Sequence, residues 1–249
     1  LHPEARFMPT VLFVSHTGVE YPVDAHVGDT VMTAALDNAV PGIEASVPEA
    51  VDELGQGMSG STTTALLATR FLRLNPGATI LYNLICSRAV PEIIAEHGGK
   101  GIRTKNGHSY MKQIMAETGA VFAGEHSGHY YFADNYRADS GLIASMGILG
   151  EMCRTGNKLS EIRKPLERYA SSGEINTTVA DIGKVIAQIG RDYADHTQDH
   201  LDGLTVDCGS WWFNVRPSNT EPLLRLNLEA STRDECDTHV AELLSVITA

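Results

Sequence analysis

Hydrophobic positions between residues 51 and 164 alternate between the spacing of helices and that of strands. The helical spacing is clearest at Met111, Ile114, Met115 and Thr118, which recur at i, i+3, i+4 and i+7. The pattern predicts helices over Ser59–Leu74, Ser87–His97, Gly107–Thr118 and Ser140–Cys153, and strands over Ala78–Leu84, Lys100–Thr104 and Ala120–Ala123. Strands separated by helices of this length require parallel crossovers. Residues 51–164 are therefore expected to form an α/β domain with a parallel sheet.

The order of elements changes after about Lys164. Strands are predicted over Glu174–Ala180, Thr205–Asp207, Trp211–Val215 and Leu223–Glu229, and helices over Asp181–Tyr193 and Ser231–Val246. The last helix opens with Ser231 and Asp234 in a capping-box arrangement. Residues 165–249 are therefore expected to form an α+β domain with an antiparallel sheet.

Residues 1–50 carry a third pattern. Thr10–Val14 and Glu20–Asp24 predict two strands, and Pro22 implies an edge position for the second. A helix capped by Asp29 or Thr30 is predicted to follow. This order resembles the opening of a 2Fe–2S ferredoxin of the β-grasp class. We expect a partial segment of this kind, and we expect it to be mobile, because two strands and one helix bury too little to stand alone.

The positions of the cysteines exclude an iron–sulfur cluster after this first segment. The residues that follow the resemblance, 44–50, contain no cysteine, whereas such a cluster needs four thiolates close together. A redox function for the first segment is the weakest of the hypotheses for this reason. The four cysteines are widely scattered and form no CxxC pair, which also disfavours zinc and predicts reduced thiols: Cys86, Cys153, Cys208 and Cys236.

Composition and charge argue against two classes of binding partner, nucleic acids and membranes. The formal net charge is −12 and no segment carries a stripe of Lys and Arg, so binding to nucleic acid is not expected. The longest apolar runs are far shorter than the roughly 20 residues of a membrane span. No secretory signal pattern precedes Met8, and a cytoplasmic location is expected. The chain begins with Leu1, and we expect it to be a fragment.

The hexapeptide from Gly124 to His129 directly follows the strand predicted over 120–123. A glycine on each side of Glu125–Ser127 lets the backbone turn tightly at the carboxyl end of a strand, where α/β sheets place ligands. Glu125, Ser127 and His129 offer donors and acceptors that suit vicinal sugar hydroxyls. The alternatives are a polar surface loop, or a metal site at His126 and His129, which lacks further ligands nearby.

The segment from Arg216 to Pro222 lies between two predicted strands. Phosphate binding in an acidic protein needs a guanidinium group, hydroxyls and free backbone N–H groups. This segment supplies them within five positions, from Arg216, Ser218, Asn219 and Thr220. Arg225 can reach back from the following strand. The alternative is an ordinary hairpin turn, because Pro, Ser and Asn favour turns.

A third polar segment opens the helix predicted over 107–118. His108 and Lys112 lie at i and i+4 and therefore share a face, and Lys105 precedes them. The positive N-terminus of the helix adds to a site that favours an anion. A solvated first turn is an equally good interpretation of this segment alone.

Together, in this order and spacing, the three motifs resemble the α-D-phosphohexomutase family, most closely its bacterial phosphomannomutase/phosphoglucomutase branch. Supporting stretches are Leu81–Arg88, Arg168–Asn176 and Trp211–Asn214. The resemblance covers about residues 52–249 and implies the third α/β domain of the family followed by its fourth domain. It implies sugar contacts from Glu125, Ser127, His129 and His108, phosphate contacts from Arg216, Ser218, Asn219, Thr220 and Arg225, and secondary contacts from Lys105 and Lys112.

Two motifs of that family do not occur in these 249 residues. They are the Thr-x-Ser-His-Asn-Pro type motif with the phosphorylated serine, and the Asp-Gly-Asp-x-Asp-Arg loop that holds magnesium. We therefore expect no catalytic residue and no metal in this chain, although the full-length family uses magnesium. The resemblance predicts recognition of mannose or glucose 1- and 6-phosphates, with turnover only if the missing N-terminal domains are supplied. The alternative is a non-catalytic sugar-phosphate binding module.

Overall fold

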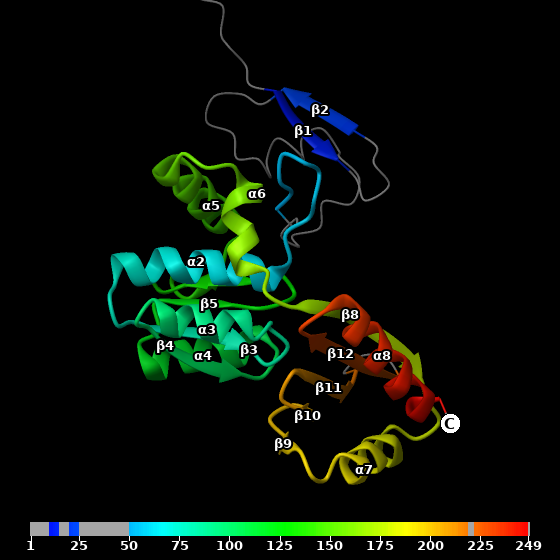
Figure 1. The fold of residues 1–249 in the computed structure, drawn as a ribbon. Coiled ribbons are helices and arrows are strands. Elements are labelled where there is room, and N and C mark those ends of the chain that lie inside the picture. Colours follow the sequence, from blue (N-terminus) through cyan, green and yellow to red (C-terminus); the bar gives the residue numbers. More distant parts are fainter. Residues whose placement is uncertain (1–9, 15–19, 25–49, 219–221, 249) are drawn as a thin grey trace, which may run out of the picture. The chain divides into compact units, whose positions relative to one another are not determined.

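The computed structural model describes residues 10–14, 20–24, 50–218 and 222–248, within two compact units, 1–46 and 47–249 (Figure 1). In the first unit, β1 (Thr10–Val14) pairs antiparallel with β2 (Glu20–Asp24), and Leu12 lies opposite Pro22. The two predicted strands are thus confirmed, and among the described residues Pro22 lies in a sheet of two strands. The predicted helix after Asp29 lies outside the described residues.

The second unit begins with an α/β domain built on a five-stranded sheet. The strands, in spatial order, are β4 (Lys100–Thr104), β3 (Thr79–Asn83), β5 (Phe122–Gly124), β6 (Tyr130–Phe132) and β7 (Ala138–Asp139). The first three are parallel, as predicted. The last two are antiparallel additions that the sequence did not predict, because strands of three and two residues are too short to show a period.

Helices cover both faces of this sheet (Figure 1). On one face Ile80 and Phe122 join a core formed with α2 (Gly60–Leu74), α3 (Ala89–Glu96), α5 (Gly141–Thr155) and α6 (Leu159–Arg163). On the other face Leu81 and Ala123 pack with α4 (His108–Thr118). Neighbouring residues of one strand thus enter different cores, as expected for a sheet that is buried on both faces.

A buried carboxylate joins α2 to α5. The Glu151 side chain, which is 2% exposed, accepts hydrogen bonds from Arg70 at 3.0 Å and from Arg73 at 2.5 Å, both on α2. A third bond comes from Arg154, three residues further along α5, at 2.7 Å. Burial alone would raise the pKa of Glu151, but the three guanidinium groups outweigh burial and hold that pKa below its usual range.

The remaining residues form an α+β domain on an antiparallel sheet. Its strands, in spatial order, are β8 (Ala170–Thr178), β12 (Leu223–Ala230), β11 (Trp211–Pro217), β10 (Leu204–Asp207) and β9 (Thr197–Asp199). The helices α7 (Ile182–Asp192) and α8 (Arg233–Ile247) supply the rest of its core. Of these elements the sequence missed only β9, which has three residues.

The two faces of this second sheet differ sharply in polarity. Leu224, Leu226 and Leu228 alternate along β12 and enter the core with α7 and α8. The residues between them point the other way, and their cross-strand partners on β11 are also polar: Arg225 pairs with Arg216, and Asn227 pairs with Asn214. Because side chains alternate along a strand, one sheet supplies both an apolar core and a polar surface. No helix in the described ranges is long and apolar enough to cross a membrane.

Candidate functional site

Three loops of the α/β domain meet at the carboxyl ends of its parallel strands, because β4, β3 and β5 run in the same direction. The loops follow Asn83, Thr104 and Gly124. This edge is where open α/β sheets place ligands. The polar segment that begins at Lys105, after β4, and the hexapeptide from Gly124 to His129, at the end of β5, are thus brought to one edge of the sheet.

Asn83, at the end of β3, ties the three loops together. Its Oδ1 atom accepts hydrogen bonds from the His126 backbone N–H and from Cys86 Sγ, both at 3.0 Å. Its Nδ2 atom donates to Asn106 Oδ1 at 2.6 Å. The residue is 1% exposed. It therefore fixes the relative positions of the loops through hydrogen bonds made by one buried side chain.

Glu125, which was expected to bind sugar hydroxyls, is buried. It is the second residue whose side chain links these loops. Its Oε1 atom accepts from the Gly107 N–H at 3.1 Å and its Oε2 atom from the Tyr131 hydroxyl at 2.8 Å. Burial and the adjacent carboxylate raise the pKa of Tyr131, so that hydroxyl remains a donor. Each carboxylate oxygen has further acceptor capacity, and in this structure Glu125 holds the start of α4 against the hexapeptide loop.

The other sugar-site candidates lie nearer to solvent. Ser127 is exposed, and its Oγ atom lies 3.2 Å from His129 Nδ1. The Nε2 atom of His129 lies 3.9 Å from Asp139 Oδ2. His108 is exposed at the first residue of α4. The loop therefore combines buried anchors with accessible polar side chains.

The two lysines named from the sequence are also accessible. Lys112 is exposed one turn after His108 on α4. Lys105 Nζ lies 5.8 Å from the centre of the Tyr110 ring, within the range of a cation–π contact. Both ammonium groups can therefore reach a ligand at the N-terminal end of α4.

The hexapeptide loop leaves no room above the start of α2. A Cβ atom on Gly60 would lie 2.2 Å from the backbone oxygen of His126 and 2.8 Å from that of Glu125. On the other side of the same contact, the Ser61 hydroxyl lies 2.8 Å from His126 Nδ1 and accepts from the Ser87 N–H at 3.0 Å. The hexapeptide loop can therefore pack on α2 in this way only because residue 60 is a glycine.

The polar face of the second sheet carries Arg216 and Arg225, two of the predicted phosphate residues. Arg216 is 7% exposed, and one of its terminal nitrogens bonds Glu174 Oε2 at 2.8 Å. Arg225 lies 3.2 Å from Glu174 Oε1 and donates to Ser218 Oγ at 3.1 Å. The structure therefore brings Arg216, Ser218 and Arg225 together, while Asn219 and Thr220 lie outside the described residues.

One cavity lies between the hexapeptide loop and the second sheet, and none of the described residues predicted to bind sugar or phosphate lines it. It is lined by Ser61, Ser87 and His126 from the loops of the α/β domain and by Trp212, Asn227 and Glu229 from the sheet of the second domain. Glu229 accepts from the Arg88 N–H at 2.9 Å and from the Trp212 indole at 3.0 Å. The cavity is thus walled by hydroxyl, imidazole, amide and carboxylate groups, a lining that suits a polyhydroxylated ligand.

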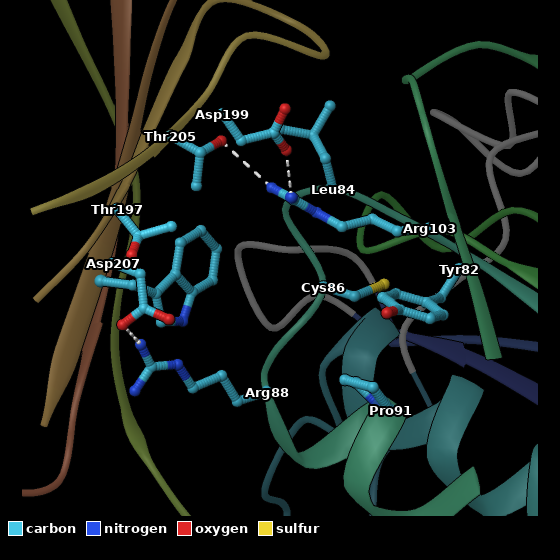
Figure 2. Close-up of a pocket in the computed structure, with 11 residues that line it drawn as sticks. Tyr82, Leu84, Cys86, Arg88, Pro91, Arg103, Thr197, Asp199, Thr205 and Asp207 are labelled. Atoms are coloured by element: carbon cyan, nitrogen blue, oxygen red, sulfur yellow. Dashed lines mark hydrogen bonds and ion pairs between the residues drawn. The ribbon is translucent and has the colours of Figure 1, made fainter. Parts of the chain in front are cut away.

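A second, smaller cavity lies beside it between the same two domains (Figure 2). Arg88 and Arg103 extend from the first domain toward the second sheet, where Arg88 pairs with Asp207, and Arg103 pairs with Asp199 and Thr205. Cys86 also lines this cavity, and burial raises its pKa to about 12. The thiol therefore stays protonated and offers no nucleophile.

Several residues of the site were not named as site residues from the sequence, although Asn83 and Glu174 lie in stretches that support the family resemblance. Asn83, Ser61 and Glu174 are ordinary polar residues within or beside predicted elements, and their partners lie 43, 65 and 42 residues away. Only the fold brings these pairs together. Within the described residues no three His, Cys, Asp or Glu side chains come together as they would around a metal ion. These residues therefore do not fit the magnesium of the resembled family.

Family models and curated relatives agree on the origin of these domains. Residues 59–169 match the α/β/α domain III of phosphoglucomutase/phosphomannomutase, and residues 174–245 match the C-terminal domain of that family. A phosphomannomutase of Methanocaldococcus jannaschii is 42% identical over 197 residues, which are 79% of this chain and 44% of that protein. A phosphomannomutase of Escherichia coli K12 is 34% identical over 182 residues, 72% of this chain and 40% of the relative.

Solved structures show the same fold. A phosphoglucomutase/phosphomannomutase family protein from Burkholderia thailandensis superposes with a TM-score of 0.69 at 32% identity, over 80% of this chain and 44% of that one. A putative phosphomannomutase from Thermus thermophilus gives 0.63 at 17% identity, over 78% and 42%, which supports the fold alone. The chain spans less than half the length of the relatives it matches. The chain belongs to the phosphoglucomutase/phosphomannomutase family and carries its α/β domain III followed by its C-terminal domain with an antiparallel sheet.

Proposed function

We propose that this chain provides the hexose-phosphate recognition of a phosphohexomutase of the phosphomannomutase/phosphoglucomutase type. The observation that carries the proposal is the cavity lined both by His126 of the hexapeptide loop and by Asn227 of the polar sheet face. A sugar phosphate needs hydroxyl recognition and anion recognition within the length of one small molecule. The proposal includes a cytoplasmic location, in keeping with four free cysteines.

The roles divide between the two domains. In this proposal Ser127, His129 and His108 bind sugar hydroxyls, Glu125 contributes an oxygen while it holds the loop, and Lys105 and Lys112 are secondary anion contacts. The phosphate that does not react is bound by Arg216, Ser218, Asn219, Thr220 and Arg225. Mannose and glucose 1- and 6-phosphates are the substrate class, in keeping with relatives that are a phosphomannomutase and a phosphomannomutase/phosphoglucomutase.

Catalysis needs parts that these 249 residues do not carry. The phosphoserine and magnesium motifs of the family are absent from the sequence, and the described residues hold no group suited to a metal ion. We therefore assign this chain no step of phosphoryl transfer. Such transfer depends on positioning and on charge neutralisation around a metal.

The 249-residue chain is expected to bind mannose 1-phosphate without converting it to mannose 6-phosphate, even with magnesium and a hexose bisphosphate. Calorimetry measures the binding, and a coupled assay measures turnover. Turnover that disappears in Arg216→Ala would contradict the lack of catalysis. If a polypeptide carrying the missing domains of a relative restores turnover, the chain is the recognition half of a mutase; failure of such a mixture favours a non-catalytic binding module.

Arg216→Ala is expected to weaken mannose 1-phosphate binding more than Ser127→Ala does. A hydrogen bond to a charged group contributes about 1.5–3 kcal/mol, against about 0.5–1.5 kcal/mol for a neutral one. Only Arg216→Ala should also weaken binding of inorganic phosphate, which has no sugar hydroxyls. Arg191→Ala, on the exposed side of α7, is the control. Equal losses for both variants with both ligands would contradict the division of roles.

A further inference from the structure

Two neighbouring cross-strand pairs on the polar sheet face are incompletely hydrogen-bonded. The pairs are Asn214 with Asn227 and Arg216 with Arg225. They hold all the buried side-chain nitrogen and oxygen atoms that lack a hydrogen-bond partner in the described parts of the chain: Asn214 Oδ1, Arg216 Nε, Arg225 Nε and Asn227 Nδ2. Three of the four are donors. A buried donor without a partner costs free energy, so a cluster of them indicates a place that a ligand with several acceptor oxygens completes.

Arg216 and Arg225 carry like charges on directly opposed strands, an arrangement that is unfavourable by itself. Glu174, from the adjacent strand β8, offsets it by giving one carboxylate oxygen to each guanidinium group, at 2.8 Å to Arg216 and 3.2 Å to Arg225. Two cations against one anion leave this cluster with a net positive charge, within a chain whose formal charge is −12. The cluster therefore still favours an incoming anion.

We propose that Glu174 is an internal anion that occupies the phosphate site of the free protein and is displaced when the phosphate group of the ligand binds. In this structure each of the two Glu174 carboxylate oxygens contacts one guanidinium group, whereas a phosphate monoester offers three terminal oxygens. The additional acceptor capacity can reach the Nε donors that Glu174 leaves unpaired. This inference rests on the proposed function, and it names the residue that sets the phosphate affinity of the same site.

The Glu174 side chain has room to move away from the two arginines. Its side chain is 28% exposed, whereas that of Arg216 is 8% exposed, so the carboxylate can turn toward water while the buried guanidinium group stays in place. Arg225 is also bonded to Ser218 in the predicted phosphate segment, which holds its charge beside the site. Glu174 thus keeps the two arginines assembled before binding, and it weakens phosphate binding because the ligand must replace it.

Glu174→Gln tests the idea, with binding of inorganic phosphate measured by calorimetry. The amide preserves the size of the side chain but removes its charge, so phosphate should bind about five- to tenfold more tightly than to the parent, in line with one charge removed from a partly screened site. Phosphate should also raise the melting temperature of Glu174→Gln more than that of the parent, relative to an equal concentration of chloride. Asp192→Asn on α7 changes the net charge equally, and it should leave both quantities unchanged.

Equal or weaker phosphate binding by Glu174→Gln would overturn the inference and make Glu174 a positioning residue instead. If that variant does not fold, Glu174→Asp replaces it, because the shorter carboxylate contacts the arginines less well and should also bind phosphate more tightly. The proposed function has its own readout. Failure of the parent to bind mannose or glucose 1-phosphate would contradict the proposed function. The ratio of the phosphate affinities of Glu174→Gln and the parent tests the role of Glu174.

Discussion

Glu151→Gln is expected to lower the free energy of unfolding by about 3 kcal/mol, as judged from hydrogen bonds to charged groups discounted for the solvent exposure of the arginines. The carboxylate is 2% exposed and is bonded by Arg70, Arg73 and Arg154, so its loss removes the charge that joins α2 to α5. Chemical denaturation measures the change. Glu117→Gln, on the exposed face of α4, is the control and should change stability little.

This contribution should depend on pH with a defined sign. The folded-state pKa of Glu151 is lowered, so the stabilisation is present above the unfolded-state pKa of about 4.3 and is lost as the pH falls through the lower folded-state value. The difference in unfolding free energy between the parent and Glu151→Gln should therefore shrink below about pH 4. A difference that stays constant from pH 7 to pH 3 would show that the charge of Glu151 is not what stabilises the contact.

Gly60→Ala is expected to destabilise the protein by roughly 1–3 kcal/mol and to weaken mannose 1-phosphate binding by about tenfold or more. The added methyl group would meet the backbone of His126 and Glu125, which is not a flexible side chain that can turn away. The hexapeptide loop must therefore shift from α2. Binding of inorganic phosphate at Arg216 should change little, since that residue lies on the second sheet.

Gly183→Ala provides the matched control. Gly183 lies in the first turn of α7, and a Cβ atom there would have only an ordinary contact, 3.5 Å from Asp181. Alanine is the better helix former, so this variant should be neutral or slightly more stable. Wild-type affinity for mannose 1-phosphate in Gly60→Ala would show that the loop position is irrelevant to the sugar.

The long elements were predictable because burial repeats along them with a fixed period. The helix from His108 to Thr118 has Met111 and Met115 buried at helical spacing, and β12 alternates leucines with polar residues. The short strands β6 and β7 complete no period, so the sequence predicted the three parallel strands of the sheet and missed its two antiparallel ones. The pattern of hydrophobic residues thus predicts a helix or strand only when that element is long enough to contain at least one full repeat of its hydrophobic period.

The site was predictable where its residues are adjacent in sequence. Arg216 and Ser218 are two residues apart, and Arg225 returns to them across a hairpin, so their meeting follows from the turn. Glu174 reaches the same point from β8, and no local pattern marks it. Glu125 lies in the predicted loop, but its bonds to Gly107 and Tyr131 depend on the packing of α4 and β6, which sequence spacing does not reveal.

The alternation along β11 and β12 also restricts how these strands can change in length. Removing Asn227 alone would shift the following residues by one position, so that the Leu228 side chain would leave the core and the Glu229 carboxylate would enter it. Removing two consecutive residues restores the facing of every later side chain. Insertions and deletions of two residues within this hairpin should therefore be tolerated far better than those of one residue. The same alternation places the phosphate residues on one face of the sheet and the leucines in the core on the other.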